Sequence, residues 1–323
     1  PPERDAVRLL VADPDRVRHE RFVDFARCLT PGDLLVVNTS ATLAAEVDGT
    51  RADGTAVLVH FSTRLEDGSW VVELRPPWPS VGPLPDVRRY ECVELPDGIR
   101  VCLIDAHPGG QSRMWRAAIA VDGGVPRYLA RHGRPIRYAY VPDRYPLADY
   151  QTVFADEPGS AEMPSAGRPF TTRIVTDLAV RGVAVAPITL HTGVSSQEPG
   201  EPPQAERYRV PTSTARLVNA TRHAGGRIVA VGTTVTRALE SAATDDGTVH
   251  ASGGWTDLVL GPDRPARVVT GLVTGWHAPG ASHLFLLQAV AGAELVDAAY
   301  TEALREQYRW HEFGDSCLLL PLR

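Results

Sequence analysis

Continuous apolar runs alternate with helical patterns at the start of the chain and throughout its second half. The runs at residues 34–38 (LLVVN), 183–191 (VAVAPITLH) and 227–232 (RIVAVG) are apolar almost throughout, which is typical of strands buried on both faces of a sheet. Further strands are expected at residues 8–13 and 268–277. Helices are expected at residues 21–28, 173–181, 212–223, 233–243, 284–291 and 294–309. This alternation predicts an α/β fold.

Residues 48–147 have a different pattern. Short runs with partial alternation of apolar and polar residues are separated by Asp-Gly and Pro-Gly turns, as in antiparallel hairpins. We therefore predict an inserted small all-β domain at residues 48–147. The α/β catalytic domain is then expected to comprise residues 1–47 plus 148–323.

The stretch YQTVFADEPGSAEMPSAGRPFT joins these two regions at residues 150–171. It predicts a short strand at 151–154, a loop rich in glycine and proline, and a helix that begins at 171–172. A loop of this composition has a defined backbone and can bring main-chain N–H groups close to a ligand. On the residues alone, an ordinary surface connection is an equally good interpretation.

Composition excludes several classes of function. The 323 residues carry a net charge of −6, and no basic run is long enough to predict a nucleic-acid-binding patch, although a local arginine cluster can sit on an acidic protein. No lysine occurs, so Schiff-base chemistry through an enzyme lysine is excluded. Residues 1–12 do not resemble a signal peptide, and no apolar run approaches the length of a membrane span.

The four cysteines are scattered and show no CxxC spacing. We interpret them as buried thiols of a cytoplasmic protein and expect no metal site. They are Cys28, Cys92, Cys102 and Cys317.

Two histidines lie at the ends of predicted strands. His191 ends ITLH, and His277 ends VVTGLVTGWH. Ligands in α/β folds gather where strands end and helices begin, so both are candidates for acid–base chemistry, although a structural hydrogen bond is the commoner role of such a histidine. The sequence has no HExxH spacing, no GxGxxG after a strand, no Walker loop and no GxSxG turn.

A third strand end leads directly into GTTVTRALE. Thr233 and Thr234 lie at the start of the predicted helix, where backbone N–H groups favour an anion or carboxylate. Arg237 and Glu240 follow one turn later and can project in the same direction. A helix cap followed by a solvated helix face is the alternative interpretation.

Blocks spread over the whole chain resemble those of the S-adenosylmethionine:tRNA ribosyltransferase-isomerases of the queuosine pathway. They are YQTVFADEPGS, PSAGRPFT, ITLHTG, RIVAVGTTVTRALESAA, GWTDLVL, GLVTGWHAPGASHLFLLQAVAG and RYRWHEFGDS. The resemblance implies a barrel-like α/β catalytic domain with a β-rich insert. It also implies that S-adenosylmethionine donates its ribosyl group to the aminomethyl group of a 7-deazaguanine in tRNA. The products would be epoxyqueuosine, adenine and methionine.

Five positions depart from the pattern of this family. Ala41 and Glu46 stand where the family has arginines, and Pro169 stands where it has a histidine. Gln197 and Glu198 replace a Phe-Arg pair. Because arginines contact phosphate, these changes leave two alternatives open beside the tRNA reaction. One is a paralogue that uses S-adenosylmethionine with a free small-molecule acceptor, and the other is a non-catalytic binding protein of the same fold.

The resemblance also suggests roles for single residues. Thr233, Thr234 and Arg237 would hold the carboxylate or ribose of the donor, and His191 would act as base or acid. Glu240 would orient His191 or Arg237. The other residues assigned to donor binding are Tyr150, Gln151, Pro164, Ala166, Gly167, Phe170 and His277.

Overall fold

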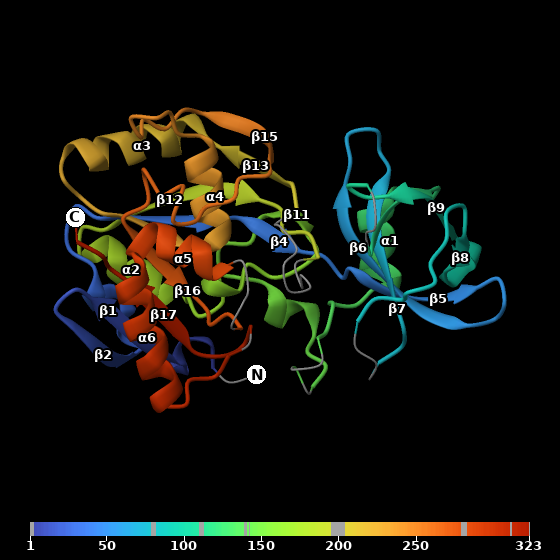
Figure 1. The fold of residues 1–323 in the computed structure, drawn as a ribbon, viewed down its shortest axis with the longest axis horizontal. Coiled ribbons are helices and arrows are strands. Elements are labelled where there is room, and N and C mark those ends of the chain that lie inside the picture. The colour runs from blue at the N-terminus through green and yellow to red at the C-terminus, as the bar shows by residue number, and fades with distance from the viewer. Residues whose placement is uncertain are drawn as a thin grey trace.

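The large domain is built on one nine-stranded sheet (Figure 1). The computed structural model describes residues 3–78, 82–109, 113–138, 141, 143–194, 204–278, 283–310 and 312–322. The strand order is β15-β13-β12-β3-β14-β16-β17-β1-β2. The strands are β1 (Arg8–Asp13), β2 (Arg16–Arg21), β3 (Leu34–Asn38), β12 (Ala184–Leu190), β13 (Glu206–Val210), β14 (Ile228–Val231), β15 (Ser252–Thr256), β16 (Gly271–Thr274) and β17 (Ser316–Leu319).

The centre of this sheet is parallel. β3 pairs in parallel with β12 on one side and β14 on the other, and β14 pairs in parallel with β16. β17 is antiparallel to β16 and parallel to β1. The carboxyl ends of β12, β3, β14 and β16 therefore lie at the same edge as the amino ends of β17 and β1. Ligands bind at this kind of edge in open α/β sheets.

Helices cover both faces of the sheet, because its central strands are apolar on both sides. α3 (Thr212–His223), α4 (Thr233–Ser241), α5 (His283–Ala291) and α6 (Ala293–Arg305) contribute buried side chains to one core. α2 (Thr172–Val180) and the short 3-10 helix η2 (Phe22–Cys28) pack on the other face. Among the described residues no single helix is long and apolar enough to cross a membrane; α5 and α6 pass that test only as a pair bent by 120°.

The β-rich region forms a closed barrel, which lies beside the α/β domain at the right of Figure 1. Its own core includes Phe61 and Trp70. The α/β class with an additional all-β unit is thus confirmed. The strands that close into a barrel are those of the all-β unit, whereas the α/β domain contains the nine-stranded sheet. The strand order is β10-β7-β6-β5-β8-β9, with β5 (Glu46–Arg51), β6 (Ala56–Arg64), β7 (Trp70–Arg75), β8 (Cys92–Glu94), β9 (Arg100–Ala106) and β10 (Met114–Ile119); α1 (Val125–His132) packs on β5.

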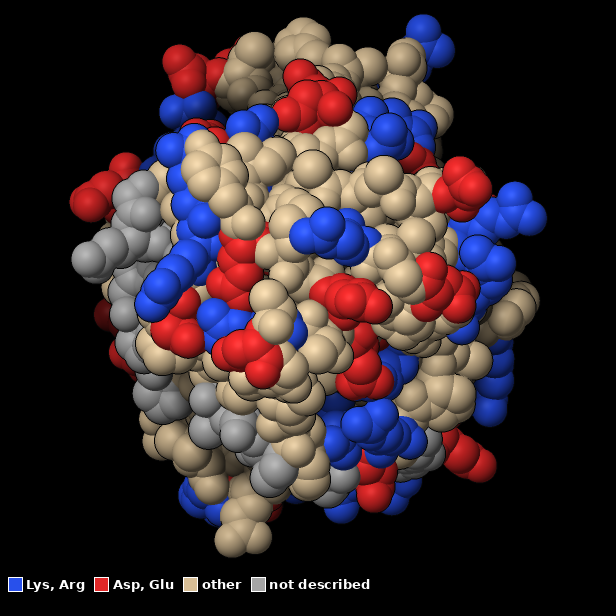
Figure 2. Space-filling view, turned by 90° about the vertical axis from the view of Figure 1, so that its right-hand side faces the viewer, with Lys and Arg blue, Asp and Glu red and all other residues tan. Residues whose placement is uncertain are grey.

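On the face of the barrel unit seen in Figure 2, blue arginines and red acidic side chains are interspersed. Within the barrel unit, Arg51 binds the carboxylates of Asp86 and Glu91, and Arg116 binds those of Asp67 and Asp105. These ion pairs bring side chains of opposite charge together on the barrel unit.

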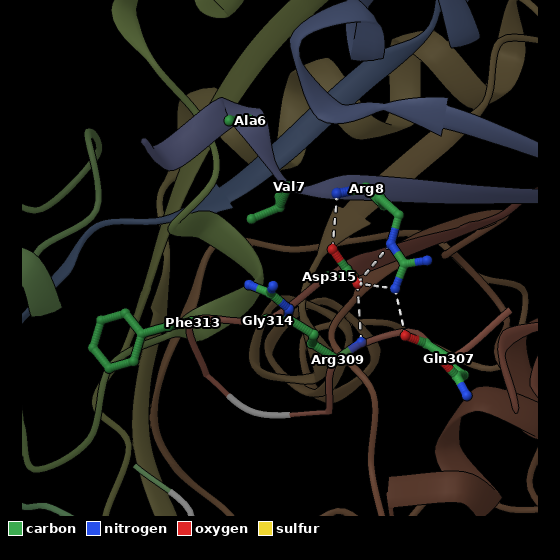
Figure 3. A pocket seen from close by; sticks show the side chains of 8 residues that line it. All are labelled: Ala6, Val7, Arg8, Gln307, Arg309, Phe313, Gly314 and Asp315. Carbon is green, nitrogen blue, oxygen red and sulfur yellow. Dashed lines mark hydrogen bonds and ion pairs between the residues drawn. The ribbon is translucent and has the colours of Figure 1, made fainter. Parts of the chain in front are cut away.

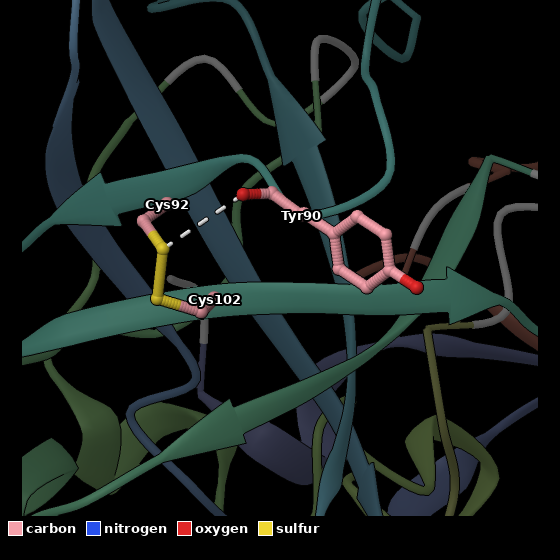
Figure 4. Close-up of a disulfide and its surroundings, with 3 residues drawn as sticks. All are labelled: Tyr90, Cys92 and Cys102. Carbon is pink, nitrogen blue, oxygen red and sulfur yellow. Dashed lines mark hydrogen bonds between the residues drawn. A yellow bond between two sulfur atoms is a disulfide. The ribbon is translucent and has the colours of Figure 1, made fainter.

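Cys92 and Cys102 form a disulfide bond (Figure 4), so the prediction that all four cysteines are thiols is wrong for this pair. The reason is the register of two antiparallel strands. β8 and β9 place Cys92 directly opposite Cys102, a relationship that spacing along the sequence does not reveal. Cys28 and Cys317 are free thiols, as predicted. Burial raises the pKa of Cys28 to about 11 and that of Cys317 further.

The joining stretch differs in detail from its prediction. Residues 151–154 are not a strand. The side-chain amide of Gln151, rather than the backbone of this segment, makes the hydrogen bonds to the backbone of Thr42. Its Oε1 accepts from Thr42 N–H at 2.9 Å, and its Nε2 donates to Thr42 C=O at 2.8 Å. The strand of this stretch is β11 (Glu157–Ser160), which pairs in parallel with β4 (Ser40–Thr42). The helix predicted at 171–172 begins as expected, with Thr171 as its N-cap.

Candidate active site

His191 is the first residue after β12, at the carboxyl edge of the sheet. Its Nδ1 lies 2.7 Å from the Ser40 hydroxyl, which comes from β4, just past the end of β3. The side chain is 15% exposed, and its Nε2 lies 3.7 Å from Glu157 Oε1. His191 is therefore fixed at Nδ1, while Nε2 faces the Glu157 carboxylate beyond the usual length of a hydrogen bond.

Three residues of β11 build the seat of this histidine. Gly159 lies against the imidazole so closely that a Cβ there would be 2.3 Å from His191 Nδ1. Ser160 Oγ lies 2.6 Å from Ser40 Oγ, and Glu157 faces Nε2. The EPGS sequence of β11 thus supplies a carboxylate, the space for the ring and a hydroxyl.

Burial favours a neutral imidazole at His191, beside an ionised carboxylate. Burial lowers the pKa of His191, and Glu157 opposes this shift. Burial raises the pKa of Glu157, but the hydrogen bond and the charge of Arg209 lower it more, so that its pKa falls below the usual value. Arg209 Nη2 binds Glu157 Oε2, which leaves Oε1 turned toward His191.

Asn38 ties together the ends of the two central strands at this edge. Its Oδ1 accepts from the N–H groups of Ser40 and Leu190, both at 3.0 Å, and its Nδ2 donates to the Leu190 carbonyl at 2.8 Å. The same Nδ2 lies 3.5 Å from Thr234 Oγ1 on α4. This buried amide fixes the backbone on which Ser40 and His191 are mounted.

The start of α4 lies beside the glycine-rich loop. Gly232 has a φ of +94°, which only glycine adopts readily, and a Cβ there would be 3.3 Å from the Ala166 Cβ. Thr233 and Thr234 are half-buried in the first turn of α4. The short helix η5 (Ser165–Gly167) is thus held against the amino end of α4.

Arg237 is turned toward protein partners. Its guanidinium forms an ion pair with Glu206 and donates to the carbonyls of Gln204, Thr256 and Leu258. These contacts join α4 to β13 and β15. Its role toward the donor remains a prediction.

Glu240 lies in another part of α4, and the expectation that it orients His191 or Arg237 requires correction. Its carboxylate accepts from the backbone N–H groups of residues 267–269 at 2.9–3.0 Å. It thereby fixes the chain that leads into β16, because a buried carboxylate is stable when several N–H groups donate to it.

His277 follows β16 at the same edge as His191. Its Nε2 lies 3.1 Å from Thr274 Oγ1, its backbone N–H donates to the Tyr300 hydroxyl, and its ring stacks on that of His283 with centroids 4.5 Å apart. Burial and the neighbouring His283 lower its pKa to about 3. His277 is therefore neutral at physiological pH.

The remaining predicted binding residues mostly support the loop. Tyr150 packs edge-on against Phe313, Gln151 binds Thr42 as described, and Gly167 lies against Thr152. Phe170 is fully buried among other aromatic rings of the core, so it presents no surface to a ligand, contrary to the expectation that it binds the donor. Pro164 is the residue before η5, and it and Ala166 are buried.

Sequence reasoning found His191 but missed Asn38, Ser40, Glu157 and Ser160. Two of the four lie in the EPGS motif, which we interpreted as part of a loop. Of the other two, Asn38 is the last residue of LLVVN and Ser40 lies two residues further on. The sequence signal that could have identified Asn38 and Ser40 is their place at and just after the end of a continuous apolar strand.

The departures from the family lie in different environments. Glu46 is buried and binds Arg134 and His60 inside the barrel unit, so it does not stand on a surface that a phosphate could contact. Pro169 is buried, and Ala41 is half-buried in β4. Gln197 and Glu198 lie outside the described residues.

A cavity of about 470 Å³ opens farther along the same edge, where β1 and β17 begin (Figure 3). In it Asp315 accepts from the guanidinium and the backbone N–H of Arg8 and from the backbone N–H of Arg309. Within the ranges that the structure describes, no group of three or more His, Cys, Asp or Glu side chains is placed to hold a metal ion.

The family model described as "Queuosine biosynthesis protein" matches residues 1–319. The chain therefore belongs to this family.

Individual relatives agree with this assignment. The chain is similar to the S-adenosylmethionine:tRNA ribosyltransferase-isomerase of Moorella thermoacetica, with 37% identity over 98% of this chain and 94% of that protein. The protein of the same name from Acidiphilium cryptum is 36% identical, over 98% of this chain and 93% of its own length. A crystal structure of S-adenosylmethionine tRNA ribosyltransferase from Thermotoga maritima matches with a TM-score of 0.53 and 28% identity, covering 99% of this chain and 94% of that one.

Proposed function

We propose that this protein is an enzyme that transfers and rearranges the ribosyl group of S-adenosylmethionine onto the aminomethyl group of a 7-deazaguanine in tRNA. Adenine and methionine would leave, and epoxyqueuosine would remain in the tRNA. The observation that carries this proposal is the seat of His191, which joins ITLH and EPGS, two of the blocks that resemble the family, at the ligand-binding edge of an α/β sheet. The names of the curated relatives support the same reaction.

The chemistry requires a proton acceptor near the sulfonium and a fixed donor. The positive sulfur acidifies the neighbouring carbon of the ribose, and loss of that proton allows adenine to leave before the amine attacks. A neutral histidine beside an ionised carboxylate supplies a hydrogen-bonding group and a proton acceptor within one site. We propose that Thr233 and Thr234, with the loop around Ala166, contact the donor.

We propose further that residues 48–147 form an inserted domain within a catalytic domain of residues 1–47 plus 148–323, although the first barrel strand, β5, begins two residues before this boundary, at Glu46. Separate hydrophobic cores support this division. We also propose that the protein acts in the cytoplasm, where tRNA is modified. The Cys92–Cys102 bond would be unusual in that compartment.

The test is an incubation of the purified protein with S-adenosylmethionine and tRNA that carries the 7-aminomethyl-7-deazaguanine base. Mass spectrometry should detect adenine, methionine and epoxyqueuosine-containing tRNA together, and none of them with tRNA that lacks the base. Adenine release with a free small-molecule acceptor but not with tRNA would identify the protein as a paralogue with another acceptor. Donor binding without adenine release under any condition would contradict the enzymatic proposal.

A further inference from the structure

His191 is held by a chain of hydroxyl groups whose direction can be worked out from the available donors and acceptors. Ser160 Oγ lies 2.6 Å from Ser40 Oγ, and Ser40 Oγ lies 2.7 Å from His191 Nδ1. Both serines are buried. Each hydroxyl has one proton to donate, and a buried donor needs an acceptor.

The Ser160 hydroxyl has one acceptor. Its oxygen already accepts the Thr192 N–H at 3.0 Å. Among the residues that the structure describes, Ser40 Oγ is the only acceptor within hydrogen-bond distance of the Ser160 hydroxyl. Ser160 must therefore donate to Ser40, and Ser40 in turn donates to His191 Nδ1. The reverse direction would leave the buried Ser160 proton without an acceptor.

We propose that this Ser160–Ser40 relay fixes neutral His191 with its proton on Nε2, so that His191 serves the reaction as a hydrogen-bond donor and not as the base. In this tautomer the lone pair of Nδ1 is occupied by Ser40, and Nε2 carries a proton. Neither nitrogen of the neutral ring can then accept a proton from a substrate.

The Nε2–H group is available to a ligand. Nε2 lies 3.7 Å from Glu157 Oε1, which is beyond hydrogen-bond length. Gly159 closes the other side of the ring, because even a Cβ there would collide with Nδ1. The imidazole consequently has one orientation, with Nε2–H toward the Glu157 carboxylate.

Glu157 is the group that remains to accept the proton. Its Oε2 binds Arg209, and its Oε1 lies beside His191 Nε2. In the proposed reaction the C–H bond next to the sulfonium breaks, its electron pair stays on carbon, and an O–H bond forms at Glu157 Oε1. The Nε2 proton of His191 stays on the ring and stabilises charge by a hydrogen bond.

This assignment of roles rests on the proposed function, whereas the tautomer does not, so the first test uses the protein without substrates. Histidine ¹⁵N NMR distinguishes protonated from unprotonated ring nitrogens, and a His191→Gln variant identifies the signal. The expected spectrum shows Nε2 protonated and Nδ1 unprotonated at neutral pH. A protonated Nδ1 with an unprotonated Nε2 would overturn the proposal.

Two variants separate the relay from a general structural effect. Ser40→Thr keeps the hydroxyl and should keep the Nε2–H tautomer, whereas Ser40→Ala removes the donor and should give a mixture of tautomers. An unchanged His191 spectrum in a folded Ser40→Ala protein would overturn the relay.

Kinetics with both substrates test the assigned roles. Ser40→Ala should lower kcat on the order of tenfold, less than the roughly 10⁴-fold loss when a catalytic histidine adopts the wrong tautomer completely. Glu157→Gln should remove the acidic limb of the pH profile of kcat, and an unchanged limb would overturn the assignment of Glu157. If NMR shows the Nε2–H tautomer but the protein does not convert the two substrates, the relay is supported and the proposed function is contradicted.

Discussion

The guanidinium of Arg237 and the carboxylate of Glu206 form an ion pair that is almost completely buried and joins α4 to β13. β13 pairs with β12, and β12 ends immediately before His191. The carbonyls of Gln204, Thr256 and Leu258 take the other donors of the guanidinium. Arg237 therefore connects the helix start near Ala166 to the strand that carries His191.

Removing this arginine should destabilise the protein. Arg237→Ala leaves Glu206 buried without its counter-ion, so we expect a loss of about 3–5 kcal/mol in the free energy of unfolding. Urea unfolding of the two proteins measures it. Arg305→Ala is the matched control, because its ion pairs are on the surface, and it should leave the free energy of unfolding almost unchanged. Equal effects of the two variants would contradict the structural role of Arg237.

Gly159 should tolerate no side chain. A Cβ at this position would lie 2.3 Å from His191 Nδ1, so Gly159→Ala should displace the imidazole and lower turnover on the order of a hundredfold. Gly261→Ala is the control, since the added Cβ would make only an ordinary contact of 3.6 Å with Phe285. Equal turnover by Gly159→Ala and Gly261→Ala would contradict the claim that turnover depends on the position of the His191 ring.

The barrel unit contains a buried histidine between two carboxylates. His60 Nε2 lies 3.0 Å from Glu46, and its Nδ1 lies 3.7 Å from Glu73. Arg134 binds Glu46 from the other side, and Arg75 and Arg113 bind Glu73. Burial alone would lower the pKa of His60, but the two carboxylates raise it above its usual value. Burial raises the pKa values of Glu46 and Glu73, and His60 and the arginines lower them more.

These shifts predict how stability depends on pH. Because the pKa of His60 is raised in the folded state, its contribution is full below the unfolded value of about 6.5 and is lost as pH rises through the folded pKa. The lowered pKa values of Glu46 and Glu73 contribute stability above about pH 4.5, which is lost as pH falls through their folded pKa values. Urea unfolding from pH 5 to pH 9 should show decreasing stability on the alkaline side, and His60→Leu should remove this decrease. A difference in the free energy of unfolding between wild type and His60→Leu that grows as pH rises over this range would contradict the assigned protonation of His60.

The disulfide bond predicts the number of reactive thiols. Iodoacetamide should modify two cysteines of the denatured, unreduced protein and four after reduction, as measured by mass spectrometry. Cys92→Ser should lower the free energy of unfolding by about 2–3 kcal/mol under oxidising conditions, the size expected for closing a short loop. The same substitution should have little effect in reductant. Four reactive thiols before reduction would contradict the pairing.

The sequence predicted the buried central strands of the sheet well, because LLVVN and RIVAVG are apolar almost throughout and such runs are stable mainly inside a protein. Barrel closure and the Cys92–Cys102 bond depend on strand register, which tertiary packing decides. The helix predicted at 294–309 ends at Arg305.

The candidate site was predicted only in part, for a related reason. His191 follows an apolar strand and was recognisable. Ser40 lies 120 residues before Ser160 and 151 before His191, and only the pairing of β4 with β11 brings them together. Glu240 was assigned to the site because it shares a helix with Arg237, but its carboxylate binds the backbone ahead of β16.

The most direct test of the central claim compares wild-type protein and His191→Ala in a single turnover with S-adenosylmethionine and tRNA bearing the 7-aminomethyl-7-deazaguanine base. The measured quantity is the rate of adenine release. We predict tRNA-dependent release by the wild type and a rate lower by about 10²–10³ for the folded variant, the usual cost of removing a hydrogen-bond donor that stabilises developing charge. Release by His191→Ala at the wild-type rate would contradict the placement of the reaction at this edge of the sheet.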